Sequence, residues 1–108
     1  MRVLFDQGTP VPLRQSLRGH EIKTAREQGW STLLNGELLR AAEKAGFDVL
    51  LTTDTSIPYQ QNLEGNKVAI VILSRNKWSL VRSTLQQIVD AVNAAKPGSC
   101  TVAEIRAK

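Results

Sequence analysis

Short apolar runs recur along the chain, and polar residues, glycine or proline bound each of them. The strongest lie within the predicted strands Phe47–Thr53 and Lys67–Leu73, where Val68–Leu73 is unbroken, and a shorter run lies within residues 2–6. Unbroken apolar runs of this length are typical of strands that are buried on both faces of a parallel sheet. Weaker patterns over His20–Thr24 and Thr101–Ile105 predict two further strands, the first near an edge of the sheet.

Helical spacing of apolar residues separates these strands. The clearest case predicts one helix over Ser79–Ala95, which the following Lys-Pro-Gly sequence stops. Gly36–Ala45 is rich in helix formers, with Asn35 as its predicted N-cap and Gly46 as the residue that ends it. A short helix is predicted from Pro10 and Pro12 to Leu17 or Arg18, because proline suits the first turn of a helix.

Strands and helices therefore alternate in the order β-α-β-α-β-loop-β-α-β, where the loop covers residues 55–66. Such alternation predicts an α/β fold with a mostly parallel central sheet and helices on both of its faces, a three-layer α/β/α sandwich. The chain has 108 residues and no internal repeat or linker, so we expect a single domain over residues 1–108.

Composition narrows the class of protein. The chain contains one cysteine, Cys100, which excludes an internal disulfide and a structural zinc site built from cysteines. No apolar run approaches the length of a membrane span, and the first residues lack the features of a signal peptide, so we expect a cytoplasmic protein. The formal net charge of +4 favours an anionic partner such as nucleic acid. A soluble protein that happens to be basic is the alternative.

Three acidic residues carry the candidate chemistry. Asp6 and Asp54 each follow a predicted apolar strand, at positions where an acid is unusual. In a parallel sheet both lie at the carboxyl edge, where ligands bind in open α/β folds. Glu37 lies in the first turn of the helix that follows a strand, so we expect it at the same edge.

Converging carboxylates repel one another, and a hard cation with oxygen ligands relieves that repulsion. Mg²⁺ or Mn²⁺ is therefore the expected cofactor, and such an ion can orient water and stabilise charge on a phosphodiester. Arg75 and Lys77 follow a predicted strand end and would contact a nucleic-acid backbone. Ser56 and Asn35 are further polar candidates for substrate binding at this edge.

Each acid also has a structural interpretation. Asp6 can cap the first helix or accept hydrogen bonds from loop amides. Glu37 is placed where a first-turn acid stabilises the helix dipole. Asp54 can organise the turn that follows it. The residues alone leave these alternatives open.

The same residues resemble small bacterial PIN-like proteins. Met1–Pro10 is similar to their opening strand, acid and proline, and Gly19–Ile22 resembles their Gly-His-acid-apolar segment. Residues 35–39 look like their acidic helix start, and Leu50–Ser56 resembles their apolar-Thr-x-Asp-x-Asp motif. These matches span residues 1 to about 73 and are moderately specific in order and spacing.

The resemblance implies an α/β/α sandwich and Mg²⁺- or Mn²⁺-dependent ribonuclease activity, often as the toxin of a toxin–antitoxin pair. Asp6, Glu37 and Asp54 would then be the catalytic and metal-binding acids. The expected partners are RNA and an antitoxin protein, with no membrane and with a homodimer as an open possibility.

The sequence departs from the family pattern at two positions. Asn35 stands where the family often has an acid, and Ser56 replaces the second aspartate of the third-strand motif. A non-catalytic PIN-like module that binds nucleic acid or protein is therefore an alternative hypothesis. A receiver-like phospho-acceptor domain with Asp54 as acceptor is a third, although residues 55–66 are too few for its intervening helix and no acid pair follows the first strand.

Overall fold

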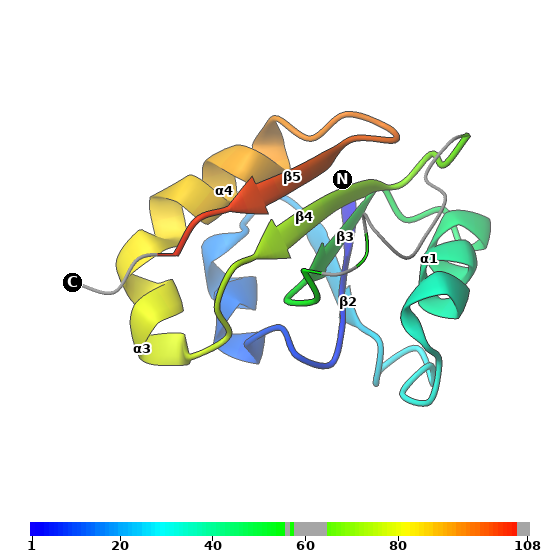
Figure 1. Cartoon of the computed structure of the whole chain (residues 1–108), viewed down its shortest axis with the longest axis horizontal. Helices are drawn as coiled ribbons and strands as arrows, with labels where there is room; N and C mark the ends of the chain where they lie inside the picture. Colours follow the sequence, from blue (N-terminus) through cyan, green and yellow to red (C-terminus); the bar gives the residue numbers. More distant parts are fainter. Residues whose placement is uncertain (56, 58–64, 106–108) are drawn as a thin grey trace.

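A five-stranded sheet forms the centre of the protein, and all neighbouring strands in it run parallel. The computed structural model describes residues 1–55, 57 and 65–105 (Figure 1). The sheet order is β2-β1-β3-β4-β5. The strands are β1 (Arg2–Phe5), β2 (Glu21–Thr24), β3 (Val49–Thr52), β4 (Ala69–Leu73) and β5 (Cys100–Ala103). The prediction of an α/β fold with a mostly parallel sheet is confirmed.

Helices cover both faces of this sheet. On one face lies α1 (Asn35–Lys44), and on the other lie the short 3₁₀ helix η1 (Val11–Ser16) and α4 (Leu85–Asn93) (Figure 1). Two short segments, α3 (Trp78–Val81) and η2 (Arg82–Thr84), lead into α4. No helix in the described part of the chain has the length and apolarity that a bilayer crossing requires.

Alternating side chains of the central strands build two cores. Leu4 and Leu50 point to the α1 face, where they pack with Leu38 of the helix. Phe5 and Leu51 point to the opposite face and pack with residues of η1 and α4. All residues of β3 and β4 are buried, as the unbroken apolar runs predict.

The helix predicted over Ser79–Ala95 is wrong as one continuous element. The chain forms α3, then a 3₁₀ turn at η2, then α4. The Ser83 hydroxyl donates to the Leu80 carbonyl at 2.7 Å, and the Thr84 hydroxyl donates to the Val81 carbonyl at 3.2 Å. These side chains compete for carbonyls that a regular helix would use, which explains the local break.

The start of α1 also differs from the prediction. The helix begins at Asn35, and Leu34 occupies the N-cap position that was predicted for Asn35. The Leu34 side chain makes no capping hydrogen bond, but the Leu34 N–H donates to the side chain of Glu37 at 3.3 Å. Glu37 therefore satisfies an amide at the helix start, which is half of a capping box. At the other end Gly46 has φ +82°, as a helix-terminating glycine requires.

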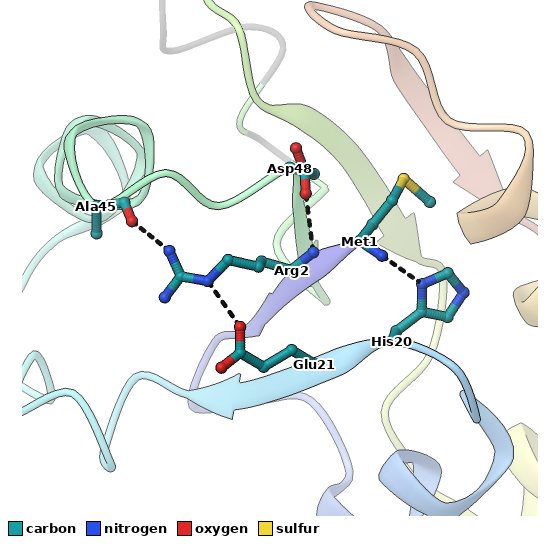
Figure 2. A network of polar contacts seen from close by, with 6 residues as sticks. All are labelled: Met1, Arg2, His20, Glu21, Ala45 and Asp48. Atoms are coloured by element: carbon teal, nitrogen blue, oxygen red, sulfur yellow. Dashed lines mark hydrogen bonds and ion pairs between the residues drawn. The ribbon is translucent and has the colours of Figure 1, made fainter.

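A polar network at the amino edge of the sheet joins β1, β2, the end of α1 and the turn before β3 (Figure 2). The Arg2 guanidinium pairs with Glu21, donates to the Ala45 carbonyl and lies over the Phe47 ring, 4.5 Å from its centroid. The Arg2 N–H donates to Asp48 at 2.8 Å. Arg2 thus connects β1 to β2, to the end of α1 and to the turn before β3.

His20 belongs to this structural edge as well. Its Nδ1 accepts from the terminal amine at 3.3 Å (Figure 2), and its Nε2 lies 2.8 Å from the Asn93 side-chain oxygen. These contacts connect the residue before β2 to the end of α4 and place His20 at the amino edge, away from the carboxyl edge.

Candidate functional site

The carboxyl ends of β1 and β3 form a topological switch point. After β1 the chain passes to the face of η1 and α4, whereas after β3 it passes to the α1 face, where Ile57 is buried. The two connections diverge from adjacent strands, and in open parallel sheets such a divergence is where ligands bind. Asp6 follows β1 and Asp54 lies two residues beyond β3, so both acids lie at this point.

The Asp6 carboxylate accepts hydrogen bonds on both of its oxygens. Its Oδ1 accepts from the Gly8 N–H at 3.1 Å and lies 2.7 Å from the Thr9 hydroxyl, and its Oδ2 accepts from the Thr52 hydroxyl. The Thr9 hydroxyl also lies 2.8 Å from the Leu51 carbonyl, so its one proton is shared. The interpretation of Asp6 as an acceptor for loop amides is thereby confirmed.

These contacts leave Asp6 able to take a ligand. A carboxylate offers about four acceptor positions, and protein donors occupy three of them. The side chain is only partly buried. The existing bonds also fix its orientation, which is the condition for a precise ligand position.

Thr52 links the two acids. Its hydroxyl donates to Asp6 and accepts from the Asp54 N–H at 3.1 Å. Thr9 and Thr52 are the buried polar side chains of the described residues, 4% and 0% exposed respectively. The most buried hydroxyls of this part of the protein therefore converge on one carboxylate. Sequence reasoning did not single out either threonine.

Gly8 allows the loop after β1 to approach β3. A Cβ at this position would lie 2.4 Å from the Thr53 hydroxyl oxygen, closer than real contacts allow. A larger residue would therefore displace Thr53 or the loop. The small residue keeps Asp6 beside Thr52.

Glu37 lies apart from this hydrogen-bonded group. Beyond its bond to the Leu34 N–H, its exposed side chain lines a groove of about 860 Å³ between α1 and residues 65–67. Arg40 and Lys44 line the same groove. Among the described residues, no group of three histidine, cysteine or acidic side chains is placed to hold a metal ion. The convergence of all three acids remains a prediction.

Cations flank the two aspartates along the carboxyl edge. The order of strands places Arg26, which follows β2, on one side, and Arg75 and Lys77, which follow β4, on the other. All three side chains are exposed. The two remaining candidates cannot be placed, because Ser56 and the side chain of Asn35 lie outside what the structure describes.

Comparison with known proteins adds no relative. Neither a scan of family models nor searches of curated proteins and of solved structures found a match to this chain.

Proposed function

We propose that this protein is a PIN-like, divalent-metal-dependent endoribonuclease with its metal held by Asp6 and Asp54. The observation that carries the proposal is their position at the β1–β3 switch point, joined through the Thr52 hydroxyl. Carboxylate oxygens are the ligands that Mg²⁺ and Mn²⁺ prefer, and such sites retain several waters. The three-layer PIN-like arrangement and a toxin role with an antitoxin partner belong to the same proposal.

The chemistry follows from the charges at this edge. A bound Mg²⁺ or Mn²⁺ would supply an oriented water and stabilise the charge that develops on a phosphodiester. Asp6, already oriented by three donors, and Asp54 would hold the ion. Arg26 on one side, with Arg75 and Lys77 on the other, would contact the RNA backbone.

Glu37 has a conditional place in this proposal. One of its carboxylate oxygens accepts from the Leu34 N–H at 3.3 Å at an exposed helix start, and the other oxygen would be the one that joins the metal centre. The two acids of the switch point are therefore the primary ligands, and Glu37 is the third. Asn35 and Ser56 remain proposed substrate contacts.

RNA cleavage tests the proposal. Wild-type protein, Asp6→Asn and Asp54→Asn are incubated with single-stranded RNA and Mn²⁺, with Asp90→Asn as the matched control. Asp90 is an exposed acid of α4 that accepts from Gln86, and it lies outside the proposed site. We expect cleavage by the wild type and the control, and a loss of about 10²-fold or more in each site variant.

Two results would reject this function. Equal cleavage by all four proteins would show that the activity belongs to a contaminant or to another site. RNA binding by the wild type without cleavage under any divalent ion would favour the non-catalytic module instead.

A phospho-acceptor role for Asp54 is the second candidate. The order β2-β1-β3-β4-β5 is the strand order that flavodoxin-like folds share, and Asp54 follows β3 at their ligand-binding switch point. Incubation with acetyl phosphate and Mg²⁺ would then add one phosphoryl group to the wild type and none to Asp54→Asn. Absence of that mass increase in the wild type would remove this candidate.

A further inference from the structure

The two edges of the sheet differ in how their backbone groups are satisfied. In the ladder between β4 and β5, Ile70 donates to the Ser99 carbonyl and Ser74 donates to the Ala103 carbonyl. Backbone groups alternate along a parallel strand, so Thr101 and Ala103 face β4. The N–H and C=O groups of Cys100 and Val102 consequently point outward from the sheet.

The opposite edge, at β2, is largely closed by its own chain. Glu21 donates to the Met1 carbonyl just before β1, and Ala25 donates to the Phe5 carbonyl of β1. Because backbone groups alternate along the strand, the outward groups at this edge belong to Ile22 and Thr24. The Thr24 N–H donates to Glu27 at 2.8 Å, and the Thr24 carbonyl accepts from the Gln28 N–H. Along β2, Ile22 is thus the one residue whose outward N–H and C=O have no hydrogen-bond partner among the described residues.

No comparable closure exists at β5 within the described residues, where the outward groups of Cys100 and Val102 have no hydrogen-bond partner. The strand carries no charge and no proline, the usual protections of an exposed edge. Cys100 and Val102 also present their side chains to solvent, and Val102 is 48% exposed. An uncharged, β-favouring edge of this kind is a template for another strand.

From this edge we propose that the protein self-associates, with β5 of one copy pairing antiparallel to β5 of a second copy. Two-fold symmetry makes such a contact self-complementary, because each copy offers the same donors and acceptors. In one copy β5 is the edge strand of the sheet (Figure 1), and in the pair the two sheets would join into one with the two β5 strands at its centre. This inference is independent of the nuclease proposal.

Charges beside the strand favour a second copy in the antiparallel direction. Lys96 lies four residues before β5, at the start of a turn closed by the Ser99 N–H, and Glu104 directly follows the strand. Both side chains are exposed and make no ion pair with a described residue. Antiparallel pairing brings the lysine end of one strand to the glutamate end of the other, whereas parallel pairing would bring like charges together. A four-residue strand offers a small contact area, so we expect a weak, concentration-dependent dimer.

Sedimentation velocity over a wide concentration range tests the proposal. Val102→Pro removes an outward N–H and leaves the β4 ladder intact, because proline is tolerated where the N–H faces solvent. Val102→Thr keeps the backbone N–H and has a side chain of similar shape, so it is the matched control. We expect the wild type and Val102→Thr to dimerise, and Val102→Pro to raise the dissociation constant at least about tenfold.

A monomeric wild type across the whole range, or a Val102→Pro protein that dimerises as tightly as the wild type, would overturn the inference. Cross-linking of the unmodified protein provides a test that does not depend on a variant's folding. A short bis-maleimide should join two native copies through Cys100, and Cys100→Ser should abolish the product. Equal yields from native and urea-unfolded protein would also overturn it.

Discussion

At the residue scale, the candidate site depends on Thr52 as much as on its acids. The hydroxyl of this fully buried residue donates to Asp6 and accepts from the Asp54 N–H. A buried hydroxyl in an apolar strand is stable only when it is hydrogen-bonded. The two functions of the hydroxyl, as donor and as acceptor, fix the relative positions of the acids.

Thr52→Val should therefore destabilise the protein by about 1–2 kcal/mol, because a carboxylate oxygen and an amide lose their partner. Thr53→Val is the matched control, since the Thr53 hydroxyl makes no hydrogen bond with a described residue, and we expect a change within about 0.5 kcal/mol. Urea unfolding of both variants measures the difference. Equal stability losses in the two variants would contradict the role of Thr52.

Glu27 gives a prediction about pH. The Thr24 N–H, and then the Arg14 side chain, favour the ionised carboxylate and hold its pKa below the ordinary glutamate value. A lowered folded-state pKa contributes stability above the unfolded-state pKa, and that contribution is lost as the pH falls through the folded-state pKa. Stability should thus decrease in the acidic range.

An NMR titration measures the Glu27 pKa directly. We expect a midpoint below that of an unfolded glutamate, and in Arg14→Gln a midpoint closer to it but still lowered, because the Thr24 amide remains. A wild-type midpoint at or above the unfolded value would show that this carboxylate does not close the β2 edge as described.

A site residue can be predicted from the sequence when its immediate neighbours in the chain already make it unusual. Asp6 and Asp54 are predictable because an acid after an apolar run is a local anomaly. Thr9 and Thr52 are not, because threonine is an ordinary strand residue and its role here depends on the register between β1 and β3. Glu37 was expected at the site, but the contact that the structure shows is the hydrogen bond it accepts from the Leu34 N–H at the start of α1.

At the element scale, strands are more predictable than helices in this protein. Each expected strand forms within about two residues of its predicted bounds, because buried parallel strands read as continuous apolar runs. The helix over Ser79–Ala95 shows the limit of periodicity. Its apolar spacing persists through the break at η2, so periodicity alone does not reveal the hydroxyl bonds of Ser83 and Thr84.

The double substitution Ser83→Ala and Thr84→Ala should restore a regular helix across η2. Alanine removes the competing hydroxyls and has the higher helix propensity, so we expect more helical ellipticity and a gain of about 1 kcal/mol. Far-UV circular dichroism and urea unfolding provide the measurement. Unchanged ellipticity with lower stability would mean that packing, and not the hydroxyls, imposes the break.

At the scale of the whole molecule, strand order is what the sequence does not reveal. η1 and α4 lie on the same face, although β2 and β5 lie at opposite edges of the sheet. The connections from β1 to β2 and from β4 to β5 therefore have opposite hands, and one of them is left-handed. Parallel crossovers are almost always right-handed, so no general rule predicts this arrangement.

The same topology provides the central argument for function. It places Asp6 and Asp54 on neighbouring strands at the switch point. Exposed cations follow the strands on either side of them, Arg26 after β2 and both Arg75 and Lys77 after β4. Residues far apart in sequence thus meet because β1 and β3 are neighbours. We propose that this place on the sheet edge binds a divalent metal.

Paramagnetic broadening of backbone amides by Mn²⁺ is a direct test of metal binding at this edge. We expect selective broadening in residues 5–9 and 52–55 and weak effects at the amino edge near His20 and Asp48. The selective effect should be lost in Asp54→Asn but not in Asp90→Asn. Broadening centred on the groove beside Glu37, or none at any concentration of the ion, would contradict it.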